Sequence, residues 1–174
     1  MGNLVLRNRI PRNYFLTSGK GESDITVHAG SFDMALMKAG IHNVNIIMYS
    51  SILPPTAREI DGAELPFGCV AETIMAVQSG SMGERVTAGL TYGWVYKNNK
   101  KLGGLVAECH GDMSRKGAED VLSASLNGMF TSRFDPRHYK LKNVKMKIES
   151  FFPKKKFGTA IVAIVFTDHT YSKE

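Results

Sequence analysis

The stretch ERVTAGLTYGWVYKNNKKLGGLVAECHG, residues 84–111, decides the fold class because it predicts two strands joined by a tight turn. Both halves are rich in β-branched, aromatic and small apolar residues, which are typical of strands. Between them lie Asn98 and Asn99. Asparagine favours the left-handed backbone that a tight hairpin turn requires. We therefore expect an antiparallel hairpin with strands at residues 84–97 and 101–111.

Four further strands and two helices are expected around this hairpin. Strand composition recurs in residues 43–51, 69–78, 141–152 and 159–168. Residues 28–40 have apolar side chains at helical spacing, with Ser31 as the expected N-cap and Gly40 as the C-terminal stop. Residues 114–134 predict a longer helix, whose apolar stripe comprises Ala118, Val121, Leu122, Leu126, Met129 and Phe130. This order predicts an α+β fold, a layered αββα-type sandwich of mostly antiparallel strands with two main helices.

Length and composition indicate a single domain over residues 1–174. Of the 174 residues, 43% are hydrophobic and 22% are charged, and a domain holds ~150 residues on average. Cys69 and Cys109 lack the paired spacing of a zinc site or a disulfide framework, so we expect no metal and a reducing compartment. No signal peptide or membrane-spanning run is evident. We therefore expect a cytoplasmic protein without a membrane partner.

The net charge of +6 has two interpretations. It indicates either a polyanionic partner such as RNA or a strand with a solvated lysine face. The basic residues concentrate near the C-terminus, at Lys142, Lys145, Lys147 and Lys154–Lys156. Because no helix-turn-helix, finger spacing or RNA-binding aromatic pattern accompanies them, we favour the solvated face and expect no nucleic acid as a partner. A basic nucleic-acid-binding module stays as an alternative function.

Ser50 and Ser51 lie between an expected strand and the strand-ending pair Pro54 and Pro55. Taken alone, two small hydroxyl residues at this point indicate an exposed strand end or a turn. The other interpretation is that the peptide bond between Ser50 and Ser51 is itself reactive. The surrounding sequence decides between the two.

The serine pair begins the run Ser50-Ser51-Ile52-x-Pro54-Pro55. Two runs precede it: Phe32-Asp33-x-Ala35-Leu36 and Gly40-Ile41-x-Asn43-x-Asn45. Three more stretches extend the pattern: SGKGESD (18–24), KLGGLVAECHG (101–111) and KKKFGTAIVAIVF (154–166). Together they resemble the pyruvoyl-dependent arginine decarboxylase family, from about residue 19 to about residue 166. The Ser-Ser-Ile-x-Pro-Pro segment is the most specific part of this resemblance.

The resemblance implies an enzyme that processes itself. Cleavage between Ser50 and Ser51 would give a β chain of residues 1–50 and an α chain of residues 51–174. The α chain would begin with a pyruvoyl group derived from Ser51, which is the implied covalent cofactor. That group would form a Schiff base with L-arginine and accept electrons as CO₂ leaves, with agmatine as the product. The implied assembly is a homo-oligomer, a trimer of cleaved αβ units.

The resemblance also assigns residue roles. The implied catalytic residues are Ser51, Glu108 and Asn45, and Glu108 is the general acid that protonates the carbon after CO₂ has left. The implied substrate-binding residues are Asp33, Val44 and Ile52. A carboxylate such as Asp33 suits a guanidinium group because it can accept two parallel hydrogen bonds. Plainer interpretations stay open: Asp33 complements a helix dipole, Asn45 bonds within a sheet, and Glu108 is a solvated strand-end residue.

Asn45 supplies a geometric expectation. Six residues of extended strand separate it from Ser51 by ~20 Å, so the two residues of one chain do not meet, and a shared site would lie between subunits. Two departures from the family concern the substrate: His42 replaces a glycine that many members have, and residues 22–32 form a longer segment. Another cationic amino acid such as lysine is therefore an alternative substrate, and a relative that no longer processes itself is a third possibility.

Overall fold

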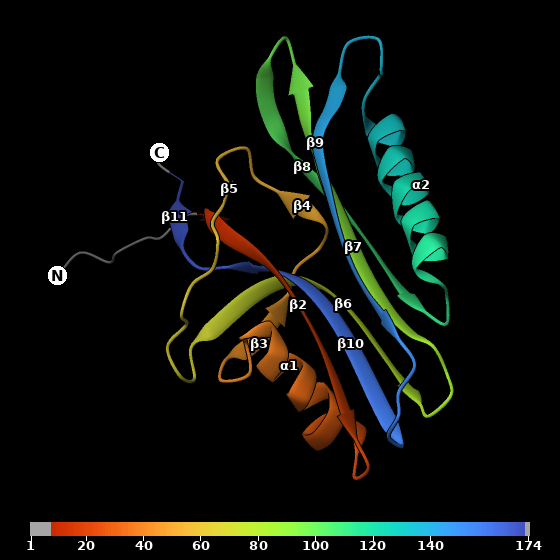
Figure 1. Ribbon diagram of the computed structural model, residues 1–174. Helices are drawn as coiled ribbons and strands as arrows, with labels where there is room; N and C mark the ends of the chain where they lie inside the picture. Colours follow the sequence, from red (N-terminus) through yellow and green to blue (C-terminus); the bar gives the residue numbers. More distant parts are fainter. Residues whose placement is uncertain (1–7, 173–174) are drawn as a thin grey trace, which may run out of the picture.

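The computed structural model describes residues 8–172, which form strands, two α-helices and a π-helical turn (Figure 1). The strands are β1 (Arg9–Pro11), β2 (Asn13–Ser23), β3 (Asn45–Met48), β4 (Ile52–Leu53), β5 (Arg58–Glu59), β6 (Val70–Ser81), β7 (Val86–Lys97), β8 (Lys100–Gly111), β9 (Lys140–Phe151), β10 (Phe157–Phe166) and β11 (His169–Tyr171). The helices are α1 (Asp33–Ala39), which continues from the π-helical turn η1 (Val27–Phe32), and α2 (Arg115–Arg133). The first large sheet has the order β3-β6-β10-β2-β5, the second has the order β4-β8-β7-β9, and β1 pairs with β11 in a short ribbon.

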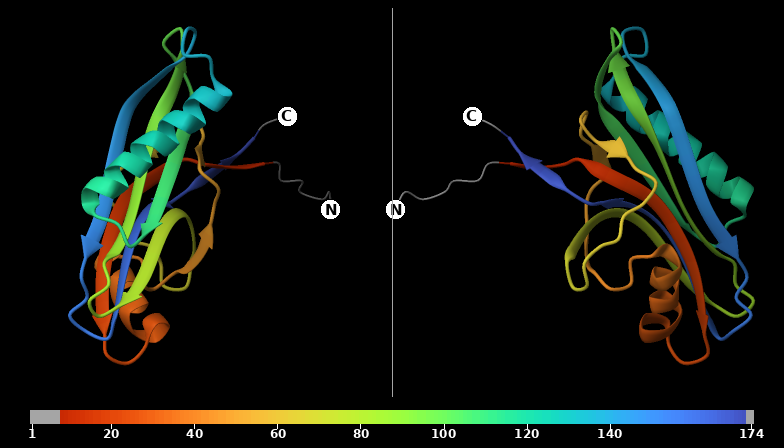
Figure 2. Two further views of the ribbon diagram at one scale, coloured as in Figure 1. Left: turned by 90° about the vertical axis from the view of Figure 1, so that its right-hand side faces the viewer. Right: turned by 60° about the vertical axis from the view of Figure 1, so that its left-hand side comes forward.

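The two large sheets stack face to face between the two helices, as both views in Figure 2 show. The core between the sheets is built from large side chains such as Tyr14 and Leu90. On the outer face of the five-stranded sheet, α1 buries Leu36, and on the outer face of the four-stranded sheet, α2 buries Leu122 and Phe130. The predicted αββα sandwich is confirmed. Its strand pairs are mostly antiparallel, and the exceptions are β3 with β6 and β2 with β5.

The hairpin and the long helix form where local sequence signals are strongest. Strands β7 and β8 are joined through Asn98 and Asn99, whose φ angles of 47° and 63° are both left-handed. Ser114 caps α2, because its hydroxyl accepts a hydrogen bond from the Gly117 N–H at 3.0 Å. The predicted apolar stripe of α2 faces the sheet except at Val121, whose side chain is 44% exposed. Neither α1 nor α2, the helices of the described residues, is long and apolar enough to cross a bilayer.

The first helix begins differently from the expectation. Ser31 is not the N-cap of α1, because η1 runs directly into the helix and Phe32 precedes its first residue. The Ser31 hydroxyl is buried and shares a hydrogen bond of 2.8 Å with the hydroxyl of Thr159 on β10. Because the Ser31 hydroxyl is bonded to β10, it is not available to cap α1. The end of the helix agrees with the prediction, since Gly40 has a left-handed φ of 74°.

The predicted strand over residues 43–51 is too long. Strand β3 ends at Met48, and β4 begins at Ile52 in the other sheet. The residues between them leave one sheet and enter the next. The serine pair therefore lies in the connection between the two strands, with Ser51 directly before the first residue of β4.

Strand β2 is long, although glycine and polar residues hide it in the sequence. It pairs with β10 over ten residues, from Tyr14 to Ser23. Gly19 and Gly21 lie directly under α1, where a Cβ atom on either glycine would collide with backbone oxygens of the helical segment, those of Ala35 and Ser31. The two glycines thus let the helix backbone rest on the strand, which is the physical reason for the run SGKGES.

We expect Gly19→Ala to destabilise the fold, because the added methyl group would overlap backbone atoms of α1. Backbone atoms cannot move aside as the end of a flexible side chain can. The free energy of unfolding should fall by about 1–3 kcal/mol, measured by urea denaturation. Gly62→Ala is the matched control, since nothing lies within 4 Å of the added methyl group. Equal stability of the two variants would contradict this account of β2.

Candidate active site

The chain crosses from one sheet to the other at the serine pair. On the upstream side, the Tyr49 N–H donates to the Thr73 carbonyl of β6 at 2.7 Å. On the downstream side, the Ser51 carbonyl accepts from the Val106 N–H of β8 at 3.0 Å. The peptide bond between Ser50 and Ser51 therefore lies between two fixed points, one in each sheet.

The reactive atoms of the pair already have hydrogen-bond partners. The Ser51 hydroxyl donates to Oε1 of Glu108 at 3.1 Å. The Ser50 carbonyl oxygen accepts from the Ile52 N–H at 2.9 Å, which closes a three-residue turn. A carboxylate beside a hydroxyl can take its proton, and an N–H on a carbonyl oxygen stabilises the negative charge of an addition step. This arrangement places one group of each kind beside the peptide bond between Ser50 and Ser51.

Glu108 lies within β8, which extends to Gly111. The plainer sequence interpretation had placed it at the end of a strand. Side chains alternate along a strand, so Glu108 is on the same face of β8 as Val106, toward the space between the sheets. Its side chain reaches solvent, yet protein atoms surround the carboxyl group closely enough for partial desolvation to raise its pKa. The hydrogen bond from Ser51 and the charge of His110 oppose this shift and are weaker.

The predicted site residues fall into two groups. Ser50, Ser51, Ile52 and Glu108 come together at the crossing. Asp33, Val44 and Asn45 lie instead on α1 and at the start of β3, and within residues 8–172 no hydrogen bond joins them to the first group. The Asn45 side chain donates to the Gly68 carbonyl at 2.9 Å, and Asp33 is exposed in the first turn of α1.

Sequence reasoning missed the backbone groups that hold the crossing. These are the N–H groups of Ile52 and Val106 and the carbonyl of Thr73. No residue type signals such a role, because every residue except proline offers the same N–H. The one signal available was the spacing of Val106 and Glu108, two residues apart on one predicted strand, which places them on one face.

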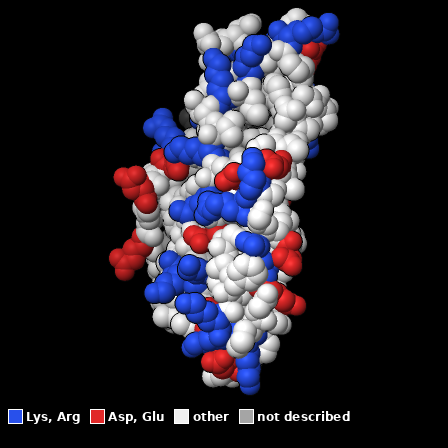
Figure 3. Space-filling view, turned by 45° about the vertical axis from the view of Figure 1, so that its right-hand side comes forward, with Lys and Arg blue, Asp and Glu red and all other residues white. Residues whose placement is uncertain are grey.

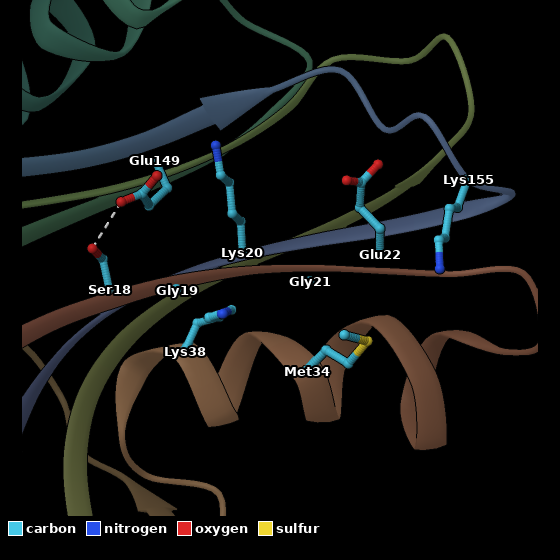
Figure 4. Close-up of a pocket in the computed structure, with 9 residues that line it drawn as sticks. All are labelled: Ser18, Gly19, Lys20, Gly21, Glu22, Met34, Lys38, Glu149 and Lys155. Atoms are coloured by element: carbon cyan, nitrogen blue, oxygen red, sulfur yellow. Dashed lines mark hydrogen bonds between the residues drawn. The ribbon is translucent and has the colours of Figure 1, made fainter.

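A groove of about 440 Å³ follows β2 beside α1, away from the crossing (Figure 4). Gly19 and Gly21 form its floor, and the side chains of Lys20, Lys38 and Lys155 reach into it from three segments. Glu149 is engaged by the Ser18 hydroxyl at 2.8 Å. None of the predicted catalytic or substrate-binding residues lines this groove.

Basic residues are spread over the face that Figure 3 shows, with acidic residues between them. On β9, Lys145 pairs with Glu59, and Lys142 lies over the ring of Tyr96 at 5.4 Å. The lysines of β9 therefore cover neighbouring side chains, as expected of a solvated strand face. The predicted basic segment is present, without an uninterrupted basic stripe on this face.

Sequence comparisons place the chain in a family. The family model described as pyruvoyl-dependent arginine decarboxylase matches residues 13–171. The chain belongs to the pyruvoyl-dependent arginine decarboxylase family. A protein of that name from Thermococcus sibiricus is 31% identical over 158 residues, which cover 89% of this chain and 94% of the relative. Another of that name, from Methanocaldococcus jannaschii, is 35% identical over 115 residues, which cover 66% of this chain and 67% of the relative.

This membership confirms the resemblance found in the sequence. A pyruvoyl-dependent arginine decarboxylase is an enzyme, and the family implies a covalent pyruvoyl group as its cofactor. Such a group is made from a serine in the chain. Ser51 fits that origin, because its hydroxyl is held by a carboxyl group and the carbonyl before it accepts a hydrogen bond.

The raised pKa of Glu108 leads to a prediction for the uncleaved chain. In a ¹³C NMR titration, the Glu108 carboxyl should stay protonated to higher pH than an ordinary glutamic acid, whose pKa is 4.5. Ser51→Ala should raise the midpoint further, because the lost hydroxyl stabilises the charged form. Ser132→Ala, on the exposed side of α2, is the control and should leave the midpoint in place. A lower midpoint in Ser51→Ala would show that the hydroxyl does not bond the carboxylate.

Proposed function

We propose that this protein is a self-processing, pyruvoyl-dependent decarboxylase that converts L-arginine to agmatine and CO₂. The proposal includes a single domain whose chain is cleaved between Ser50 and Ser51 into residues 1–50 and 51–174. The observation that carries it is the hydrogen bond between Ser51 and Glu108 beside the Ser50 carbonyl. Membership of the family supports the choice of cofactor and substrate.

The first step of processing is an attack by Ser51 on its own peptide bond. Glu108 takes the hydroxyl proton, and Oγ bonds to the Ser50 carbonyl carbon while the Ile52 N–H stabilises the oxyanion. The C–N bond then breaks, and the Ser51 nitrogen receives the proton from Glu108. An ester now replaces the amide.

The second stage removes the ester. A base takes the Cα proton of Ser51, the bond from Cβ to Oγ breaks, and the Ser50 carboxylate leaves as the new C-terminus of the β chain. The dehydroalanine that remains tautomerises to an imine, and water converts the imine to a ketone with release of ammonia. No oxidant is required, because elimination and hydrolysis account for every atom.

When present, the pyruvoyl group supplies a ketone that forms a Schiff base with the substrate amine and draws electrons from the bond to CO₂. The chain's own residues do the remaining work. Glu108 donates a proton to the carbon that has lost CO₂, and its raised pKa favours the acid form relative to an ordinary glutamic acid. We infer that Asp33 binds the guanidinium group, and that Val44 and Ile52 contact the substrate.

Cleavage leaves the two chains interlocked. Strand β2 of the β chain lies between β10 and β5 of the α chain, and β3 pairs with β6. Ten paired residues on β10 hold β2 in its sheet. We therefore propose an αβ unit that stays folded after processing.

We also propose that each complete site forms between two subunits of a trimer. Asp33 and Asn45 are separated from the crossing within one chain, yet the role inferred for each needs contact with the substrate. Exposed apolar side chains on and beside β3 support a buried contact there, and they are Ile47, Met48, Phe67 and Val70. Strand β3 is also an edge of its sheet.

The cytoplasm stays the proposed compartment, because Cys69 and Cys109 are both free thiols. Lysine is the competing substrate to compare with arginine.

The processing proposal is tested by two adjacent serines. Ser51→Ala removes the attacking hydroxyl, so intact-mass analysis should show one uncleaved chain that releases no CO₂ from arginine. Ser50→Ala keeps the carbonyl that is attacked, so it should be cleaved at a rate similar to that of the parent. Glu108→Gln should slow cleavage by about a hundredfold or more, because it cannot take the proton. A cleaved and active Ser51→Ala protein would refute the mechanism.

The proposal of a shared site is tested by complementation. Asp33→Asn and Glu108→Gln should each be nearly inactive for arginine in steady-state assays of agmatine release. For Glu108→Gln, the protein is first incubated until mass analysis shows full cleavage. Mixed trimers made by co-expression should regain activity at about a quarter of the sites, where two intact residues from different subunits meet.

One control and one contrary outcome show how the result is to be interpreted. Trimers that combine Asp33→Asn with Asp33→Gln subunits should stay inactive, because no site regains an intact Asp33. Mixed Asp33→Asn and Glu108→Gln trimers that also stay inactive would show that both residues act from one chain.

A further inference from the structure

A second cavity, of about 490 Å³, lies where β5 and β11 meet the start of β2. Figure 1 shows these three segments close together on the side of the molecule that carries both chain ends. The cavity is lined by Arg12, Pro55, Thr56, Arg58, Lys101 and Thr170. None of these residues belongs to the proposed active site.

Three cationic residues line this cavity, and contacts of its ammonium group hold the side chain of one of them, Lys101. The Arg58 N–H donates to the Arg12 carbonyl at 2.9 Å, so the two arginines stand on neighbouring segments. The Lys101 ammonium donates to the Ala57 carbonyl at 3.2 Å and lies 3.9 Å from the centroid of the Trp94 ring. These contacts fix the ammonium beside the cavity, where a lysine without them would extend into solvent.

Among the described residues, Arg12 is the one cation of the three that has a carboxylate within ion-pair distance. Asp168 accepts hydrogen bonds from the backbone and side-chain N–H groups of Asn13, at 2.8 and 3.2 Å, and approaches Nε of Arg12 only to 3.9 Å. Glu59 is engaged by Tyr92 and Lys145. No acidic residue lines the cavity.

The surroundings of Lys101 disfavour its charged form. Within residues 8–172, neither Arg58 nor Lys101 has an acidic partner within ion-pair distance. Burial, and then the charge of Arg58, lower the pKa of Lys101, so the site disfavours its own cations. Like charges that lie close together each disfavour the charged form of the other unless something compensates. An anion bound in the cavity would compensate these positive charges, and the cavity has room for one.

We propose that this cavity binds a phosphate-type dianion, either inorganic phosphate or the phosphoryl group of a small metabolite. Two guanidinium groups offer paired N–H donors that match phosphate oxygens, and the ammonium adds a point charge. The hydroxyls of Thr56 and Thr170 complete a polar lining. The volume lies in the range of sites for small molecules, and three cations suit a dianion better than a single carboxylate.

The bound anion would act on the segment that follows the cleavage site. Pro55, Thr56 and Arg58 lie on the connection that leads away from Ser51, whereas Lys101 lies on β8. One anion that bridges them ties this connection to the four-stranded sheet. The proposal does not depend on decarboxylase activity, because binding and stability are measured on the protein whether or not it is cleaved.

The test is calorimetric titration of the purified protein with inorganic phosphate and, separately, with glucose 6-phosphate, at ionic strength matched with sodium chloride. We expect saturable binding with one anion per chain. Arg58→Gln and Lys101→Gln should each raise the dissociation constant at least about tenfold, because each removes a charge-assisted contact. Lys20→Gln, in the groove beside α1, is the matched control and should bind like the parent.

Melting temperatures in chloride establish that each variant is folded. Tighter binding of glucose 6-phosphate than of phosphate identifies a metabolite as the natural source, and the reverse order identifies the free ion. Absence of saturable binding, or equal binding by parent and both cavity variants, overturns the proposal. So does a loss of trimers in Arg58→Gln without any binding of phosphate, since acidic groups of a second copy would then be the partner of these cations.

Discussion

The structure depends on one constraint, which is that a short connection is fixed to two different sheets at its two ends. Tyr49 is bonded to β6 in the five-stranded sheet, and Ser51 is bonded to β8 in the four-stranded sheet. The sheets cannot move apart or slide without repacking the core that they share, including Tyr14 and Leu90. The peptide bond between Ser50 and Ser51 is thus held against Glu108 by the stability of the whole sandwich. A flexible loop of the same sequence would place the hydroxyl beside the carboxyl only for a fraction of the time.

The same architecture explains why a break in the chain is tolerable. The β chain would contain α1, β2 and β3, while β6 and β10 would belong to the α chain. Because β2 pairs with β10 along ten residues and lies under α1, its departure would expose both the edge of β10 and the apolar face of α1. Gly19 and Gly21 permit the close approach that makes this packing tight.

Local patterns in the sequence were sufficient for some elements and not for others. Helix α2 and the hairpin of β7 and β8 were predicted within a few residues, because helical spacing and the Asn98-Asn99 turn are both short-range signals. Strand β2 was not predicted, because its glycines are explained by close contact with a helix that follows it in the chain, and not by strand propensity. The Ser31 cap failed because Thr159, more than a hundred residues away, binds the same hydroxyl. For the site, family resemblance paired Ser51 with Glu108, whereas the backbone donors around them depend on a sheet pairing that residue types do not reveal.

The surroundings of Glu108 reconcile two tasks that oppose each other. To begin processing, the group must be a base strong enough to accept a hydroxyl proton, and to complete decarboxylation it must be an acid. Partial desolvation serves both, since a carboxyl with a raised pKa is a stronger base when ionised and keeps more of its acid form near neutral pH. Complete burial would raise the pKa so far that the ionised form is lost, whereas full exposure would leave the group too weak a base. Ser51 and His110 limit the shift by favouring the charged form. Under the proposed mechanism, formation of the pyruvoyl group would remove the Ser51 hydroxyl, and with it one hydrogen bond that favours the charged form of Glu108.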